Sequence, residues 1–262
     1  MARAPSRAFD DRALGPAIDA ATRAVELRPD YAIARFFLAG ALRWDGAIER
    51  ARPLLEGAAD RAGALAPGLV EVLSFCEQHR SSARATASKF EALTSALSAA
   101  SASAPVVELG VRHGVSTRLL ASRTHATVHA FDSFAGLPTA WHAQRAGAFT
   151  TAGELPSVPD NVVFHVGLFE DTLPSFVADL QECPGFVHFD SDLYESARVA
   201  LAALGPRLGA GTVLCFDEYL GNAHWRADEH RAFTEAAERF GWRWGARTVS
   251  WITGQASFVL GA

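Results

Sequence analysis

After Pro105 the sequence alternates short apolar runs with helical stretches, and each run ends in glycine or aspartate. Near-continuous apolar strands separated by helices are typical of a parallel sheet whose two faces are both covered. We expect strands at residues 106–110, 127–132, 162–167, 185–190 and 212–217. Residues 244–261 hold two strand-like runs broken by a Thr-Gly turn, which predicts an antiparallel pair at the sheet edge. The sequence therefore predicts an α/β, doubly wound, mostly parallel sheet with an antiparallel C-terminal strand pair.

The first third of the chain has a different pattern, rich in Ala, Leu, Arg and Glu without strand-like alternation, which predicts helices. Small residues recur from Ala17 to Ala51 with the roughly 34-residue spacing of tetratricopeptide units, and Pro29 stands at the expected closing turn. Residues 14–62 thus resemble about one and a half such units, fewer than the three that usually stand alone. We expect these helices to pack on the rest of the chain.

Three segments follow from these patterns. We predict a helical, tetratricopeptide-like segment at residues 1–80, one amphipathic helix and a small-residue linker at 81–104, and the sheet domain at 105–262.

Composition excludes several classes of protein. A formal charge of −5 and a pI near 6.0 leave no basic face for nucleic acid. Apolar runs are too short to cross a membrane, and the start of the chain lacks the apolar segment of a signal peptide. Three distant cysteines without a CxxC motif predict neither a zinc site nor a disulfide framework. We therefore expect a cytoplasmic protein that binds neither nucleic acid nor membranes.

The ends of the first two predicted strands indicate a cofactor site. The first is followed by Gly110 and Gly114, which let the backbone approach a ligand, and by a helix that Ser116 can start. The second ends in Asp132, where a carboxylate usually accepts hydrogen bonds from a ribose. A turn or a helix cap also explains each feature alone, but together they favour a cofactor that carries a nucleoside. The dinucleotide motif would need glycine in place of Arg112, which disfavours a nicotinamide cofactor.

The ends of the fourth and fifth predicted strands indicate a metal site. Asp190 closes one strand, and Asp217 with Glu218 closes the next. Carboxylates that meet at one rim raise each other's pKa, and a divalent cation relieves that cost. Oxygen ligands without cysteine favour Mg²⁺. Lys89 is the only lysine in the chain, and its remote sequence position predicts no lysine at this rim.

Five motifs carry a resemblance to a known family. In chain order they are VVELGVRHGVST, FDSFAGLP, LFEDTLPSF, HFDSDLYESARVALAALGPRL and TVLCFDEY. They resemble the class I S-adenosylmethionine-dependent methyltransferases of the macrocin O-methyltransferase (TylF/MycF-like) type, over about residues 105–260. The resemblance implies a Rossmann-like fold and the Mg²⁺-dependent methylation of a hydroxyl group, in known members that of a macrolide deoxysugar.

The resemblance also implies roles for residues that match its motifs. The methionine end of the cofactor would be held by Glu108, Gly110 and Ser116, its ribose by Asp132, and its adenine would lie beside Phe169 and Glu170. The metal ligands would be Asp190, Asp217 and Glu218.

The general base stays open at this point. Related catechol-type enzymes use a lysine just after the first metal aspartate, where this chain has Leu193. Histidine is the natural substitute near neutral pH. The candidates for the base are His142, His224 and His230. Asp192 is a further candidate, unless its side chain caps the following helix. Asp190 would act in catalysis through the metal, and His188 is expected to pack inside its strand. Residues 134–160 form a long loop of the kind that often closes over a site.

Two other functions remain open: a protein-interaction module on an inactive cofactor-binding scaffold, and a nicotinamide-dependent oxidoreductase. The leading prediction is an O-methyltransferase whose partner is a small-molecule hydroxyl acceptor, of the sugar or natural-product type. The N-terminal helices are expected to complete the pocket, to contact another protein or to form a homodimer.

Overall fold

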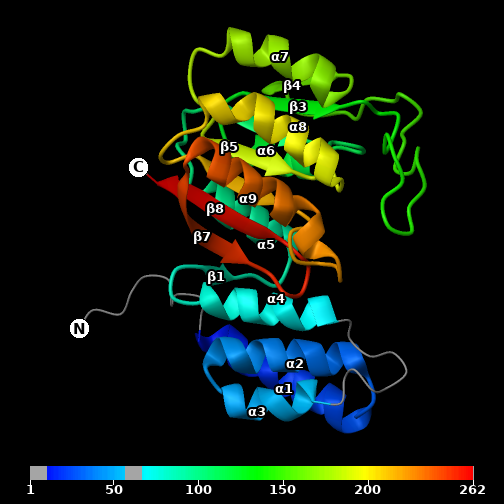
Figure 1. The fold of residues 1–262 in the computed structure, drawn as a ribbon, viewed down its shortest axis with the longest axis vertical. Coiled ribbons are helices and arrows are strands. Elements are labelled where there is room, and N and C mark those ends of the chain that lie inside the picture. Colours follow the sequence, from blue (N-terminus) through cyan, green and yellow to red (C-terminus); the bar gives the residue numbers. More distant parts are fainter. Residues whose placement is uncertain (1–10, 57–66, 262) are drawn as a thin grey trace.

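The computed structural model describes residues 11–56 and 67–261. Within these ranges one eight-stranded sheet is covered by helices on both faces, and further helices form a layer beyond one edge (Figure 1). The end of the predicted repeat, residues 57–62, lies outside the described residues.

Eight strands in the described part of the chain build the sheet, in the order β1-β7-β8-β6-β5-β2-β3-β4. Their bounds are β1 (Arg84–Ala85), β2 (Val106–Leu109), β3 (Val128–Asp132), β4 (Val162–Val166), β5 (Phe186–Phe189), β6 (Val213–Phe216), β7 (Arg243–Val249) and β8 (Ala256–Gly261). Strand β8 is antiparallel to β6 and β7, and the other neighbouring pairs are parallel. The predicted doubly wound sheet with an antiparallel C-terminal pair is therefore confirmed, and each of the five predicted parallel strands is present.

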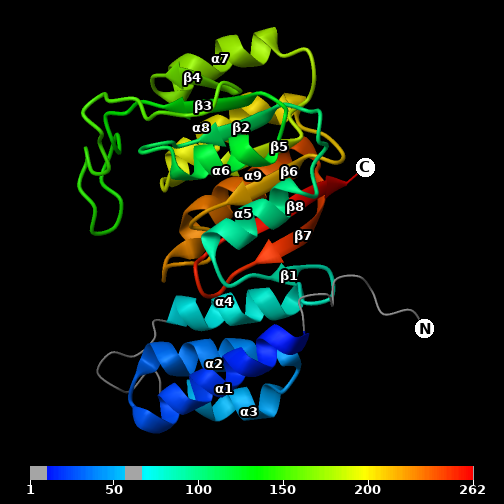
Figure 2. The same cartoon turned by 180° about the vertical axis from the view of Figure 1, so that it is seen from behind.

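Nine α-helices accompany these strands in the described residues. They are α1 (Asp11–Leu27), α2 (Ala32–Asp45), α3 (Ile48–Leu55), α4 (Pro67–Gln78), α5 (Lys89–Leu97), α6 (Val115–Arg123), α7 (Phe169–Asp179), α8 (Tyr194–Leu204) and α9 (Glu229–Phe240). Helices α7, α8 and α9 lie on one face of the sheet and α5 and α6 on the other, as the two views from opposite sides show (Figures 1 and 2). None of the helices described is long and apolar enough to span a membrane.

Neighbouring residues of the central strands point into two different cores. On β2, Val106 packs with α5 and α6, whereas Val107 belongs to the larger core that includes α8 and α9. On β5, Phe186 and Val187 divide in the same way. Both faces bury side chains, which explains why these strands are mostly apolar rather than alternating, with Glu108 on β2 and His188 on β5 as the polar exceptions.

The N-terminal helices share the larger core with the sheet. Buried residues of α2 and α4, such as Leu42 and Leu73, belong to the same cluster as Phe258 of β8. At the contact, the indole of Trp225 donates to the carbonyl of Gly68 at 3.0 Å. The helices therefore pack on the sheet as expected, and their tetratricopeptide character stays a prediction.

Residues 81–104 differ from the predicted single helix. Arg84 and Ala85 form β1, which pairs in parallel with Thr248 and Val249 of β7, so β1 and not the antiparallel pair is the sheet edge. A strand of two residues has no periodicity to detect, and the open edge of β7 provides its hydrogen-bond partners. The helix of this segment is α5, which begins only after β1.

Gly40 of α2 offers a test of this packing. A Cβ atom at Gly40 would lie 2.4 Å from Nε1 of Trp251, in the turn between β7 and β8. We expect Gly40→Val to lower the free energy of unfolding by about 1–3 kcal/mol, measured by urea denaturation, because α2 would have to move away from the sheet. The matched control is Gly15→Val in α1, where a Cβ meets nothing within 4 Å. Equal effects of the two substitutions would contradict this packing.

Candidate active site

A pocket lies at the carboxyl edge of the sheet, where the strand order reverses. From β2 the chain continues to β3 on one side, whereas β5 and β6 lie on the other side of β2. This is the position where open α/β sheets bind their ligands. The pocket has a volume of about 520 Å³, within the usual range for small-molecule sites. Of the predicted cofactor residues, its lining includes Gly110, Ser116, Asp132, Phe169 and Glu170.

The turn after β2 forms one wall of the pocket. Gly110 has a φ of +98°, and a Cβ atom there would lie 1.9 Å from the backbone oxygen of Asp190, so the ends of β2 and β5 approach closely at this residue. Gly114 is the N-cap of α6 and lies outside the pocket lining. Ser116 lines the pocket as the second residue of α6, where free backbone N–H groups of the first turn favour an anionic ligand.

Asp132 holds the two neighbouring loops in place. Its Oδ2 accepts hydrogen bonds from the backbone N–H groups of Val111 at 2.7 Å and Arg112 at 2.8 Å, and its Oδ1 accepts one from Phe134 at 2.7 Å. Its side chain therefore organises the turn after β2, and its predicted contact with a ribose stays a prediction. Ser133, for which the sequence predicted no role, also lines the pocket.

The loop at residues 134–160 contributes to the pocket lining. Phe149 lines the pocket and lies under the guanidinium of Arg112, which is 4.9 Å from the centre of the ring. This cation–π contact connects the loop to the turn after β2. Phe169 and Glu170, at the start of α7, line the pocket where the resemblance implies the adenine.

Glu108 is not in the pocket lining but lies beneath it. It is fully buried on β2, and its Oε1 lies 3.1 Å from Nδ1 of His188 on β5. Its Oε2 is buried and has no hydrogen-bond partner among the described residues. The role in binding methionine that the resemblance implies for Glu108 stays a prediction.

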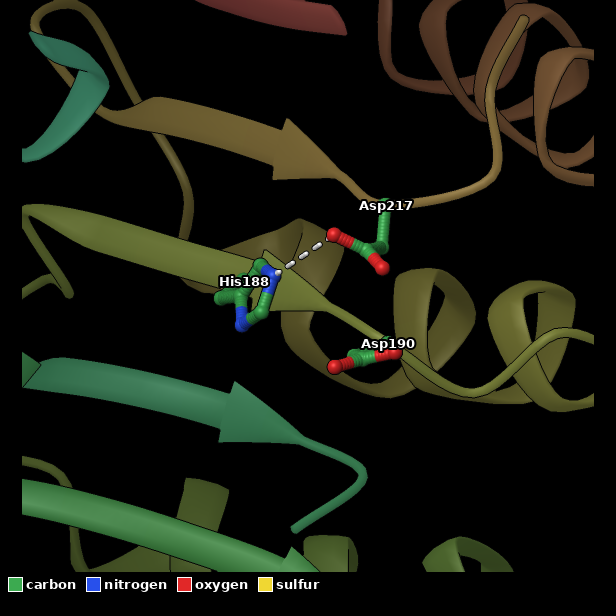
Figure 3. A group of neighbouring side chains, drawn as sticks. All are labelled: His188, Asp190 and Asp217. Atoms are coloured by element: carbon green, nitrogen blue, oxygen red, sulfur yellow. Dashed lines mark ion pairs between the residues drawn. The ribbon is translucent and has the colours of Figure 1, made fainter. Parts of the chain in front are cut away.

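His188, expected to pack inside its strand, is buried and also contacts the acids. Its Nε2 lies 3.9 Å from Oδ1 of Asp217. Figure 3 shows the two aspartates, Asp190 and Asp217, just beyond the ends of β5 and β6, with the imidazole of His188 beside them. Burial lowers the pKa of His188, but the carboxylates of Asp217 and Glu108 outweigh it and raise this pKa to about 9.

The structure brings Lys89 into the acid cluster, so the expectation that no lysine lies at this rim is wrong. The ammonium nitrogen of Lys89 lies 2.9 Å from Oδ2 of Asp190 and 2.7 Å from Oδ2 of Asp217. The cause is topological: Lys89 is the first residue of α5, and the N-terminus of α5 lies at the carboxyl edge of the sheet. More than 100 residues separate Lys89 from either aspartate, so sequence proximity carried no signal.

The acids of this cluster differ in how their charge is compensated. Burial raises the pKa of Asp217, but the neighbouring His188 and Lys89 outweigh this effect and hold it below its ordinary value. Burial and then the charge of Asp190 raise the pKa of Asp192 to about 7. Burial and then the charge of Asp217 raise the pKa of Glu218 well above its usual range. Asp217 therefore has an ion pair with Lys89, whereas Lys89 and Arg112 lower the pKa of Asp192 by less than burial and the neighbouring acids raise it.

The predicted magnesium ligands fall into two groups of neighbouring atoms. One group is His188, Asp190 and Asp217, and the other is Asp190, Asp192 and Glu218; in each, the potential ligand atoms lie within 4.8 Å of one another. The second group fits a divalent cation, because all three residues line the pocket and Oε2 of Glu218 is buried without a partner among the described residues. The ligand set Asp190, Asp217 and Glu218 stays a prediction.

The three histidines considered as general bases lie outside the pocket lining. Nε2 of His142 lies 2.8 Å from Oδ2 of Asp228, and its ring stacks on that of His224 with 5.2 Å between the centres. His230 packs against Trp225 and other aromatic rings, and burial lowers its pKa to about 4. The rings of His142 and His224 therefore contact each other, and His230 lies apart from them among aromatic side chains. Of the candidates for the base, Asp192 lines the pocket.

Comparisons with known proteins agree with this geometry. Residues 107–219 match a family model described as a methyltransferase domain. The structure is similar to that of CalS11, described as a calicheamicin methyltransferase, with a TM-score of 0.54, 18% identity and coverage of 97% of this chain and 95% of that one. It is also similar to the O-methyltransferase NovP, with a TM-score of 0.50, 20% identity and coverage of 66% of this chain and 80% of that one.

No curated protein matches the sequence. At these identities the solved structures show the fold alone, and the family model covers the residues that line the pocket except Lys89 and Phe90. Residues 107–219 thus match a methyltransferase domain, and they lie in a chain that has the Rossmann-like methyltransferase fold.

Proposed function

We propose that this chain is an S-adenosylmethionine-dependent and Mg²⁺-dependent O-methyltransferase that acts on a hydroxyl group of a small sugar or natural-product-like molecule. The observation that carries the proposal is one pocket with two chemically different halves, a glycine turn with a helix N-terminus on one side and three carboxylates on the other. The names of two structures with the same fold, an O-methyltransferase and a calicheamicin methyltransferase, support the reaction and the kind of acceptor.

The cofactor half of the pocket offers a partner for each end of S-adenosylmethionine. The start of α6 at Ser116 presents backbone N–H groups to the carboxylate of the methionine end. Asp132 and Ser133 lie at the end of β3, where ribose hydroxyls bind in such sheets. Phe169 and Glu170 form the wall beyond them, suited to a flat, hydrogen-bonding adenine.

In this proposal the acidic half provides the proton acceptor for the reacting hydroxyl. S-adenosylmethionine supplies a methyl group already activated on a sulfonium, so the C–S bond breaks, with its electron pair passing to sulfur, as the acceptor oxygen forms the new bond. The hydroxyl proton leaves to a pocket carboxylate or to water. The protein mainly orients the acceptor oxygen towards the methyl group, and Phe90 and Phe149 give the lining two aromatic surfaces.

A magnesium ion at the acid cluster would lower the pKa of the acceptor hydroxyl and orient it. Asp190 and Glu218 would hold it, because both line the pocket and Oε2 of Glu218 is buried without a partner among the described side chains.

Asp190→Asn tests whether the pocket has one half that binds the cofactor and a separate acidic half that acts on the acceptor. We expect S-adenosylmethionine to bind this variant within about twofold of wild type, while transfer of a labelled methyl group to vicinal diol acceptors falls by at least about 100-fold. Calorimetry and a radioactive transfer assay provide the two readouts. Asp179→Asn, on the exposed end of α7, is the matched control and should retain full activity. Equal loss of binding and transfer in Asp190→Asn would assign Asp190 to the cofactor half instead.

The same calorimetry tests the alternative functions. Binding of a nicotinamide cofactor in place of S-adenosylmethionine would favour an oxidoreductase, and binding of neither would favour an interaction module. Membership of the macrocin type, a cytoplasmic location and a homodimer or protein contact through the N-terminal helices stay predictions.

A further inference from the structure

Lys89 stands where a helix does not favour a cation. It is the first residue of α5, and the N-terminal end of a helix dipole repels positive charge. Ser88 caps this helix by accepting a hydrogen bond from the backbone N–H of Glu91 at 3.2 Å, and the Glu91 carboxylate accepts one from the backbone N–H of Ala87 at 3.1 Å. These hydrogen bonds fix the backbone on both sides of Lys89. Interactions within the helix do not explain a cationic side chain at this position.

Contacts with two aspartates explain the cationic side chain at this position. The ammonium of Lys89 bridges Oδ2 of Asp190 and Oδ2 of Asp217. The remaining oxygen of Asp217, Oδ1, accepts a hydrogen bond from Nε2 of Gln255 at 3.1 Å. Both oxygens of Asp217 thus have donors, and its side chain is 6% exposed.

Asp217 lies outside the pocket lining, whereas its partner Lys89 is part of it. The lining of the pocket includes Lys89, Asp190, Asp192 and Glu218 but not Asp217. A cation that arrives from the pocket therefore meets Asp190, Asp192 and Glu218, whose potential ligand atoms lie within 4.8 Å of one another. Asp192 has a φ of 62°, a backbone conformation that costs energy for a residue other than glycine and that often marks functional sites.

We propose that Lys89 is a resident cation and a positioning residue of this site: it keeps Asp217 out of the set of metal ligands, so that a divalent cation is held by Asp190, Asp192 and Glu218. This inference rests on the proposed Mg²⁺ dependence. Lys89 fixes Oδ2 of Asp190 and leaves the other oxygen of that carboxylate for the metal. The ammonium stays in place when the cation binds.

Three variants that each remove one negative charge test the ligand set. In the full-length protein, we expect Asp192→Asn and Glu218→Gln to weaken Mn²⁺ binding by at least about 100-fold, as loss of a direct ligand does, whereas Asp217→Asn weakens it by less than about tenfold. Mn²⁺ binding is measured by electron paramagnetic resonance. Asp217→Asn is the matched control, because it removes the same charge from the same cluster.

The single lysine of the chain permits a second readout. Protein labelled with [¹⁵N]lysine carries one lysine side chain, so its ammonium signal belongs to Lys89. We expect this signal to persist at saturating Mg²⁺ and to disappear through fast proton exchange in Asp217→Asn. If Mg²⁺ removes the signal from wild type, or if Asp217→Asn loses Mn²⁺ as completely as Glu218→Gln, the metal displaces Lys89 and the proposal is wrong.

The failure of this inference is distinguishable from failure of the proposed reaction. If wild type binds no Mn²⁺, the pocket-side metal site and the proposed Mg²⁺ dependence are both wrong, while S-adenosylmethionine binding and methyl transfer without metal would still support O-methylation. If S-adenosylmethionine does not bind but the Mn²⁺ results are as expected, the reaction is wrong and the ligand set stands.

Discussion

Replacing Gly110 by alanine is expected to lower the free energy of unfolding by about 3 kcal/mol or more and to weaken S-adenosylmethionine binding at least about tenfold. The new Cβ would lie 1.9 Å from the backbone oxygen of Asp190 and 2.7 Å from its carbonyl carbon. Backbone atoms cannot yield as the end of a side chain can, so the turn after β2 and the end of β5 must separate. Both halves of the pocket depend on this contact, because the turn carries the cofactor side and Asp190 the acidic side.

Gly153→Ala is the control that distinguishes the effect of the steric clash at Gly110 from the effect of backbone strain. Gly153 has a φ of +83°, close to the +98° of Gly110, but a Cβ there meets nothing within 4 Å. We expect this control to cost about 1 kcal/mol, the price of a left-handed backbone for alanine, without a change in cofactor affinity. Urea denaturation and calorimetry measure the two quantities. If both variants lose the same stability, the close approach of β2 and β5 does not hold the site together.

Lys89→Met is expected to lower the free energy of unfolding by about 2–3 kcal/mol. The substitution leaves Asp190 and Asp217 without their ammonium partner in a largely buried site. Removal of one partner from a fully buried ion pair costs about 3–5 kcal/mol, and the value here is smaller because the side chain of Lys89 is 32% exposed. Urea denaturation in the absence of divalent cations measures the effect. Arg52→Met, which breaks an exposed pair with Glu49, is the control and should cost less than about 0.5 kcal/mol.

The double variant Lys89→Met, Asp217→Asn shows whether the loss comes from an uncompensated charge. We expect the second substitution to restore about 1–2 kcal/mol, because it removes one of the two carboxylates that lost their partner. Losses that simply add would mean that Lys89 stabilises the fold through its aliphatic stem rather than through its charge. Binding of S-adenosylmethionine to each folded variant confirms that the cofactor half of the pocket is intact.

The sheet was predictable because its strands are buried on both faces. A strand such as β6, with apolar side chains on either side, reads as an uninterrupted apolar run, and the helices between such runs require a parallel sheet. The antiparallel pair of β7 and β8 was predictable from two strand-like runs close together in the sequence, although residues 250–255 connect them rather than a Thr-Gly turn alone. Strand β1 was not predictable, since two residues have no pattern and only the open edge of β7 selects them.

Part of the candidate site was predictable for the same reason. The carboxyl ends of parallel strands lie at one rim, so Gly110, Asp132 and Asp190 had to meet there once the strands were identified. The positions of the histidines were not predictable, because His142 lies in an irregular loop and His224 in a turn, and neither has a periodic constraint. The structure places both outside the pocket lining.

The sequence by itself determined the order along the chain of the strands after Pro105 and the rim at which the glycines and acids gather, because those features follow from local periodicity and from the rules of parallel sheets. Only the tertiary structure decided which charges compensate one another there. Lys89 reaches Asp190 and Asp217 because α5 packs on the sheet with its N-terminus at the carboxyl edge. Such a contact depends on the packing of elements far apart in the chain, which no local pattern records.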